Sequence, residues 1–187
     1  VMKKLLGVLF FILISSLFTK TAYTNEKIVN LLKDGGKVVF IRHAYAPGNG
    51  DPHNFDIKNC STQRNLNNDG ISQSKNIGEF FSKNNIQIDK VFSSEWCRCK
   101  DTAQFAFKTF ETFNALNSFY DPRFEKNKTI QVKNLKNFIN SWNGNKNLIL
   151  VTHFVVISEV LGIGVSSGEI VVSDKNFIIQ GTLEINS

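Results

Sequence analysis

The stretch VVFIRHAYAPGNGD, Val38 to Asp51, joins an apolar run to two polar side chains and a loop. Residues 38–41 are apolar and rich in β-branched side chains, which is typical of a strand buried on both faces of a parallel sheet. Arg42 and His43 follow directly, and the Pro and Gly after them predict a turn away from the strand. We expect a loop from Ala44 to about Leu66, and loops of this length inside compact domains are usually functional.

The rest of the chain alternates between helical and strand patterns. Apolar residues at helical spacing predict helices near residues 25–36, 67–85, 98–110, 132–142 and 154–162. Strands are expected at residues 37–43, 89–94 and 145–153, and at two places within 168–185 around a tight turn at 174–176. Residues 114–128 are expected to be irregular. This alternation predicts a three-layer α/β/α sandwich with a mainly parallel sheet, formed by one domain over residues 25–187.

Residues 1–24 are expected to form a secretory signal peptide. Lys3 and Lys4 precede the uncharged apolar run LLGVLFFILISSLF, which small and polar residues follow. A single transmembrane anchor is the alternative, but the run is shorter than the roughly 20 residues that a membrane span needs. A cleaved signal predicts a periplasmic or secreted protein that keeps no membrane span.

The charge of the chain argues against a nucleic-acid partner. The formal net charge is +6, and Lys3, Lys4 and Lys20 account for three of these charges, so the remainder of the chain is only mildly basic. The other Lys residues are scattered singly, without the basic stripe that nucleic-acid binding requires. This balance fits a surface with some bias toward small anionic substrates.

The chain has three cysteines, Cys60, Cys97 and Cys99. Export would permit a disulfide, and the expected bridge joins Cys60 to either Cys97 or Cys99. Three buried reduced thiols are one alternative. A zinc site made with His53 is another, although the spacing matches no standard pattern of zinc ligands. We therefore predict no metal.

Residues suited to phosphate chemistry follow three of the predicted strands. Arg42 and His43 follow the first, Arg98 lies shortly after the second, and His153 ends the third. Because ligands of open α/β sheets bind at the carboxyl ends of the strands, we expect these four side chains to meet.

Two Arg and two His are a suitable set for handling a phosphoryl group. The planar guanidinium of Arg offers paired donors that match phosphate oxygens and stays charged. A neutral His can attack phosphorus and carry it covalently, and a cationic His can stabilise charge in the transition state. The pattern predicts a site for a small phosphorylated substrate that needs no cofactor.

These residues carry a resemblance to the histidine phosphatase, or phosphoglycerate mutase-like, superfamily. The segments FIRHAYAPG, RNLNNDGISQSKNIGEFF, VFSSEWCRCKDTAQF and LILVTHFVVISEVLG resemble, in order, four motifs of that family, and the exported Cys pattern is similar to a small extracytoplasmic subgroup. The resemblance implies a phosphoglycerate mutase-like fold. It also implies that His43 is the nucleophile, that Arg42, Arg98 and His153 bracket the phosphate, and that Arg64 makes further substrate contacts.

The sequence departs from the family pattern at two points. Ala44 replaces a Gly, which is tolerable only if its φ is negative. Phe154 follows His153, where some members carry an acidic proton donor. The expected general acid is therefore Asp51 in the loop after His43, with Glu169 and Asp121 as the other candidates.

The favoured function is a metal-independent phosphomonoesterase that works through phosphohistidine on a small phosphorylated metabolite or an envelope sugar phosphate. A second enzymatic hypothesis is a phosphatase that acts on phosphohistidine in proteins. A phosphate-binding module of the same fold with weak or no catalysis, and a Cys/His metal-binding protein, are the non-enzymatic alternatives.

Overall fold

The computed structural model describes residues 26–187, so the expected signal peptide over residues 1–24 lies outside the described part of the chain. Within residues 26–187 a six-stranded sheet has the order β3-β2-β4-β1-β5-β6. Its strands are β1 (Val38–Arg42), β2 (Ile88–Ser93), β3 (Glu111–Thr112), β4 (Asn147–Thr152), β5 (Ile170–Ser173) and β6 (Ile179–Leu183). The strands β3, β2, β4 and β1 are parallel, whereas β5 pairs antiparallel with both β1 and the edge strand β6.

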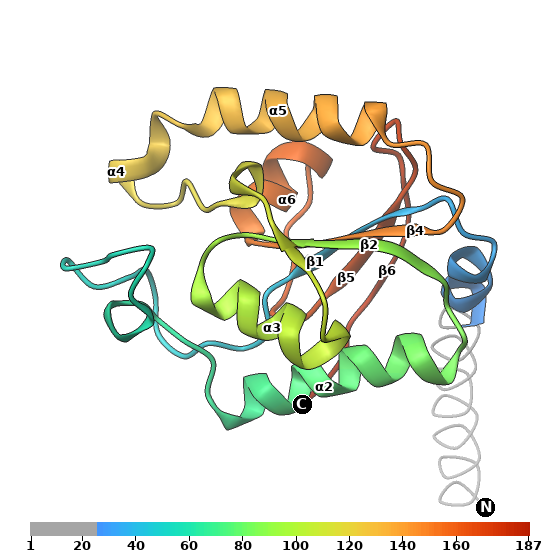
Figure 1. Ribbon diagram of the computed structural model, residues 1–187, viewed down its shortest axis with the longest axis horizontal. Coiled ribbons are helices and arrows are strands. Elements are labelled where there is room, and N and C mark those ends of the chain that lie inside the picture. The colour runs from blue at the N-terminus through green and yellow to red at the C-terminus, as the bar shows by residue number, and fades with distance from the viewer. Residues whose placement is uncertain (1–25) are drawn as a thin grey trace, which may run out of the picture.

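Helices cover both faces of this sheet, which confirms the predicted three-layer sandwich (Figure 1). The helices are a segment over residues 26–33, α2 (Asn68–Lys83), α3 (Cys97–Phe107), α4 (Pro122–Glu125), α5 (Lys128–Ser141) and α6 (Phe154–Leu161), with short 3-10 turns at Cys60–Thr62 and Asn114–Leu116. The segment 26–33, α2 and α3 lie on one face, and α5 and α6 on the other. No helix in this part of the chain has both the length and the apolar character for crossing a membrane.

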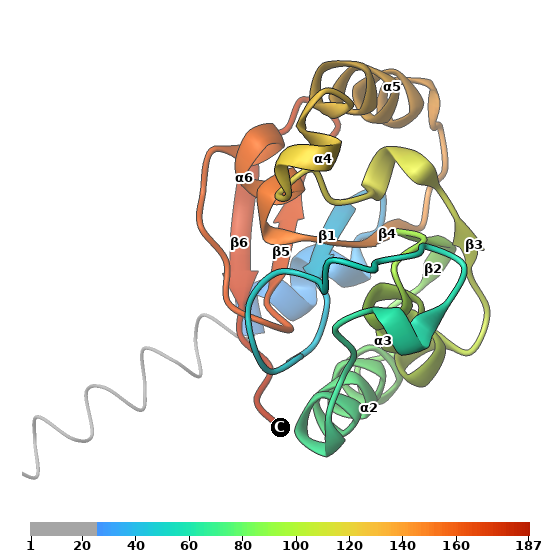
Figure 2. The ribbon, with the colours of Figure 1, turned by 90° about the vertical axis from the view of Figure 1, so that its left-hand side faces the viewer.

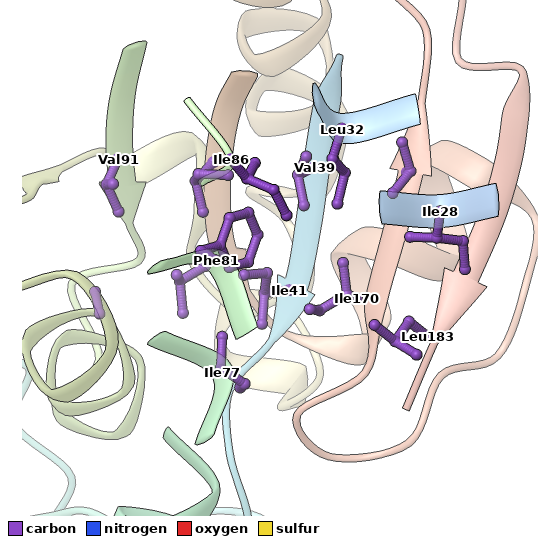
Figure 3. Packing of buried hydrophobic residues seen from close by; sticks show 14 of the residues in the cluster. Ile28, Leu32, Val39, Ile41, Ile77, Phe81, Ile86, Val91, Ile170 and Leu183 are labelled. Carbon is purple, nitrogen blue, oxygen red and sulfur yellow. The ribbon is translucent and has the colours of Figure 1, made fainter. Parts of the chain in front are cut away.

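The central strand β1 is buried on both faces, as its apolar run predicts. Val39 and Ile41 join the hydrophobic cluster under α2, α3 and the segment 26–33, which Figure 3 shows from close by. Val38 and Phe40 join the opposite cluster under α5 and α6. All four side chains are fully buried, so the alternation of the strand supplies both cores from one run of residues.

The pairing of the parallel strands sets the position of the site. In the register of β1 with β4, Arg42 lies beside Thr152, and in the register of β2 with β4, Ser93 lies beside Val151. Three strands therefore end at the same edge of the sheet, and the residues that follow them leave the sheet side by side.

The structure differs from the sequence expectation over residues 114–128. This stretch is not irregular: it contains the 3-10 turn Asn114–Leu116, helix α4 with Asp121 as its cap, and the first residue of α5. Helix α5 begins at Lys128 rather than near residue 132. Its first turn is mostly polar and shows no apolar periodicity, and it is fixed by Gln131, whose amide donates to the carbonyls of Asn114 and Asn117.

Candidate active site

The side chains predicted to bind phosphate lie together in one cavity at the carboxyl edge of the sheet. Arg42, His43, Arg98 and His153 all line this cavity, whose volume is about 160 Å³. Figure 2 looks onto this edge, with the loop that follows β1 in front of the sheet. His43 donates its backbone N–H to Thr152 O over 2.9 Å, so the ends of β1 and β4 stay joined beyond the sheet. The rings of His43 and His153 are 5.5 Å apart between centroids and meet edge to face.

The ring of His43 is held in the form that a nucleophile needs. Its Nδ1 lies 2.8 Å from Ala44 O, and because a carbonyl oxygen only accepts hydrogen bonds, Nδ1 carries the proton and Nε2 keeps a lone pair. Burial lowers the pKa of His43 well below its ordinary value, and the charge of Arg98 lowers it further. His43 is therefore neutral at pH 7.

Ala44, which replaces a Gly of the family pattern, has a backbone conformation that a residue with a side chain can adopt. Outside glycine, positive φ values in the described residues occur only at Asn85, Lys108 and Phe177, so Ala44 is not in the left-handed region. Its N–H donates to Thr102 Oγ1 over 3.0 Å, and its side chain is fully buried.

His153 lies in a hydrogen-bonded setting that the sequence did not predict. Its Nε2 is 2.9 Å from the hydroxyl of Ser94, which in turn donates to Asn117 Oδ1. Burial and then the charge of Arg98 lower the pKa of His153 well below its ordinary value. The protein alone thus favours the neutral ring, and the cationic His153 expected from the sequence would require the negative charge of a bound phosphate. The sequence signal that could have indicated Ser94 was the pair Ser93-Ser94 at the end of the second predicted strand.

The guanidinium groups of the site retain donors that no protein group uses. Arg42 donates through Nη1 to Val165 O over 2.7 Å. The Nε atoms of Arg42 and Arg98 are buried and have no acceptor among the described residues. Burial and the charge of Arg98 lower the pKa of Arg42, which shows how closely these cations are brought together. An oxyanion would relieve this repulsion and supply acceptors.

Asp51 forms a buried ion pair with Arg98. Its Oδ1 is 2.8 Å from Arg98 Nη1 and its Oδ2 is 3.2 Å from Nη2, and it also accepts from Trp96 Nε1 and the N–H of Arg64. Burial alone would raise the pKa of Asp51, but the hydrogen bonds and charge of Arg98, with the other two donors, lower it. Asp51 is thus an ionised carboxylate that orients Arg98, an arrangement that disfavours proton donation.

The two other candidate acids are also engaged. Asp121 lines the cavity and pairs with Arg123 at 2.8 Å, and the hydrogen bonds from Arg123 lower the pKa of Asp121 to about 2. Glu169 accepts the N–H of Ser166 over 2.7 Å and is not among the residues that line the cavity.

Arg64 lines the same cavity, but its guanidinium donates hydrogen bonds mainly to the loop after His43. Its Nε donates to Gly50 O over 3.0 Å and its Nη1 donates to Ala46 O. These bonds hold the turn after His43 in shape and place the guanidinium at the edge of the site.

A disulfide joins the loop after β1 to the start of α3. The bridge connects Cys60 to Cys97, so of the two expected partners it is Cys97 that is used. Cys99 is a free, buried thiol, and burial raises its pKa to about 12. This pairing replaces the alternatives of three reduced thiols and of a zinc site. In residues 26–187 no group of three or more His, Cys, Asp or Glu side chains could hold a metal ion.

Comparison with known proteins gives one family match and many similar folds. Residues 38–147 match the model of the histidine phosphatase superfamily (branch 1). No curated protein matches the chain.

Three solved structures illustrate the likeness of fold. The protein histidine phosphatase SixA complexed with tungstate is 14% identical, with a TM-score of 0.56 over 80% of this chain and 96% of that chain. A phosphoglycerate mutase from Thermus thermophilus is 16% identical, with a TM-score of 0.57 over 80% and 99%. A phosphoserine phosphatase variant from Entamoeba histolytica, in complex with phosphoserine, is 16% identical, with a TM-score of 0.55 over 78% and 95%.

Proposed function

Because the chain belongs to the histidine phosphatase superfamily, we propose that it is a phosphomonoester hydrolase that works through phosphohistidine at His43 and without a metal. The observation that carries this proposal is the neutral His43, with a free Nε2, in a cavity that it shares with Arg42 and Arg98. The proposed substrate is a small phosphorylated metabolite or an envelope sugar phosphate, which fits a cavity of about 160 Å³.

The proposed reaction has two balanced steps. The lone pair of His43 Nε2 attacks phosphorus, the P–O bond to the leaving group breaks, and its electron pair departs with that oxygen, which takes a proton from solvent. Water then attacks the phosphohistidine, the P–N bond breaks, and its electrons return to Nε2 while the water proton passes to solvent. The net change is ester plus water to alcohol plus inorganic phosphate.

Two arginines are suited to the charge that this reaction develops. Arg98 is fixed by Asp51 and Arg42 by Val165, so their donors are already aligned before the substrate binds. Proteins of the same fold are complexed with tungstate or with phosphoserine, which supports the proposal that this chain binds an oxyanion.

Replacement of His43 tests the proposal. His43→Ala should abolish hydrolysis of p-nitrophenyl phosphate, and an alkaline quench of wild type during turnover should trap phosphate on the peptide that contains His43. His53→Ala, at an exposed position outside the cavity, is the matched control and should leave the rate unchanged. Unchanged hydrolysis in His43→Ala would overturn the nucleophile assignment.

A phosphate-binding module with little catalysis is the second candidate. The observation that favours it is the engagement of Asp51 and Asp121 in ion pairs, which leaves the cavity without a carboxylic acid ready to donate a proton. This function predicts that wild type and His43→Ala bind inorganic phosphate equally and that neither hydrolyses p-nitrophenyl phosphate.

We also propose a periplasmic or secreted location. The disulfide between Cys60 and Cys97 supports an oxidising compartment. Sequencing the N-terminus of protein from the periplasmic and secreted fractions tests it, because a chain that keeps residues 1–24 and stays in the cytoplasm would contradict export.

A further inference from the structure

Three exposed aromatic side chains line the same cavity as Arg42 and His43. Tyr45, Tyr120 and Phe154 line it, and they are 45%, 47% and 38% exposed. Only two other large apolar side chains are as exposed in residues 26–187, namely Ile130 and Ile178, and neither lines the cavity. Exposed apolar residues are ordinarily scattered singly, so their concentration along one cavity points to a ligand.

Contacts within the protein position the rings of Phe154 and Tyr120 and the backbone of Tyr45 before any ligand arrives. Phe154 packs on the guanidinium of Arg42, 5.5 Å from its ring centroid, and meets the ring of Tyr120 edge to face at 5.7 Å. Tyr45 donates its N–H to Gln73 Oε1 over 2.9 Å, and its carbonyl lies so close to Gly70 that no side chain would fit there. A flat apolar group that enters the cavity would therefore meet the packed rings of Phe154 and Tyr120, next to a Tyr45 whose backbone is fixed.

The same cavity lacks a free carboxylic acid. Of the groups that line it, the carboxylates are Asp51 and Asp121, and each is paired with an arginine at 2.8 Å. Phe154, directly after His153, has no proton to give. A leaving group must then depart as an anion and take its proton from water.

This requirement separates phenols from alcohols. A phenolic hydroxyl has a pKa of about 10, whereas aliphatic alcohols are closer to water, at about 15.7. General acid catalysis contributes about 10²- to 10⁴-fold in rate, so its absence penalises alkyl phosphates far more than aryl phosphates.

We propose that the site is selective for aryl phosphates, the monoesters whose leaving group is a phenol, with Tyr45, Tyr120 and Phe154 as the specificity-determining residues. The proposal rests on the phosphatase function proposed above and narrows its substrate to aryl esters, so it disfavours the sugar phosphates, whose leaving group is an alcohol. In the first step the P–O bond to the aryl group breaks, and the phenolate leaves with the electron pair and is protonated by solvent. In the second step water releases phosphate from His43.

Three phosphate esters separate the effect of the ring from the effect of the leaving group. Phenyl phosphate has the ring and a phenolic oxygen, benzyl phosphate has the ring and an alcohol, and cyclohexyl phosphate has only the alcohol. We expect kcat/KM for phenyl phosphate to exceed that for benzyl phosphate by at least about 100-fold. The kcat/KM for benzyl phosphate should in turn exceed that for cyclohexyl phosphate by roughly three- to tenfold, because the ring lowers KM.

Variants of Tyr120 identify the source of the ring effect. Tyr120→Ala should raise KM roughly three- to tenfold for the phenyl and benzyl esters and should change the KM for cyclohexyl phosphate little. Tyr120→Phe keeps the ring and should keep the ratio of benzyl to cyclohexyl phosphate. Ile130→Ala removes an exposed apolar side chain away from the cavity and is the control. Asp51→Asn should lower kcat/KM for the phenyl and benzyl esters by the same factor, because Asp51 acts through Arg98.

Several outcomes would overturn the selectivity. The first is a kcat/KM for benzyl phosphate within about tenfold of that for phenyl phosphate. The second is a Tyr120→Ala variant whose KM rises equally for all three esters. The third is an Asp51→Asn variant whose kcat/KM falls more for the benzyl ester than for the phenyl ester. If all three esters are hydrolysed equally in a reaction that needs His43, this inference fails and the phosphatase function stands. If none is hydrolysed, both fail.

Discussion

His43 and His153 are buried among permanent cations, and this setting determines their chemistry. Each ring is almost inaccessible to solvent, and the charge of Arg98 opposes a second positive charge beside it. The proton on Nδ1 of His43 is fixed by Ala44 O, so the lone pair on Nε2 requires no base to expose it. The cost of this arrangement is that both rings resist protonation in the folded protein.

The protein should therefore lose stability as the pH falls below about 6.5. In the unfolded chain a His titrates near pH 6.5, whereas in the fold the pKa values of His43 and His153 lie well below. Between these values the unfolded state binds more protons, so the free energy of unfolding rises with pH and is lost on acidification. Each histidine contributes up to about 1.4 kcal/mol per pH unit.

Urea unfolding at a series of pH values from 6.5 down to 5 measures this slope. His43→Gln and His153→Gln should each flatten it, with His53→Gln as the exposed control. Equal slopes in wild type and in both variants would show that neither buried ring stays neutral in this window.

The elements that position the site were predictable where the sequence is strongly patterned. The strands that end at Arg42 and His153 are continuous apolar runs, and burial on both faces makes such runs distinctive. Strand β3 escaped prediction because it has only the exposed residues Glu111 and Thr112 and is defined by its pairing with β2. Helix α4 was not predicted because it has only four residues, although Asp121 and Pro122 form a recognisable helix start.

The disulfide links two of these elements and should contribute strongly to stability. Cys60 and Cys97 are 37 residues apart, and closing a loop of that length is expected to stabilise the fold by about 4 kcal/mol through the entropy of the unfolded chain. The double substitution Cys60→Ser with Cys97→Ser should lower the free energy of unfolding by about this amount, as measured by urea denaturation. A reducing agent should have the same effect on wild type and none on the double variant.

Thiol titration provides an independent check of the pairing. Denatured, unreduced protein should show one thiol, and native protein none at pH 8, because Cys99 is buried and its pKa is raised to about 12. Three thiols in the denatured protein would contradict the bridge.

At the scale of the whole molecule, the site depends on contacts that no local pattern reveals. Four of the predicted residues meet because β1, β4 and β2 are adjacent and in register, and the rule that ligands bind at the carboxyl ends of parallel strands anticipates this. The ion pair between Asp51 and Arg98 spans 47 residues of sequence, and the contact of Ser94 with His153 spans 59. Such partners could not be predicted from the sequence because they depend on how the loops fold over the sheet edge.

The folded chain as a whole should be stabilised by an oxyanion. Tungstate that binds the arginines of the cavity binds the native state only, and at 100 times its Kd it would add about 2.7 kcal/mol. For a domain of this size we expect the Tm to rise by about 5 to 11 °C. Arg42→Met removes one guanidinium from the cavity and should remove most of this shift. Lys83→Met, which removes an exposed cation from α2 away from the cavity, should keep it.

A third variant separates binding from catalysis in the same measurement. His43→Ala leaves Arg42 and Arg98 in place, so tungstate should still raise its Tm while hydrolysis is lost. Differential scanning calorimetry with and without tungstate measures all of these shifts. If wild type and Arg42→Met show the same rise, the anion binds elsewhere on this mildly basic molecule and the cavity is not its site.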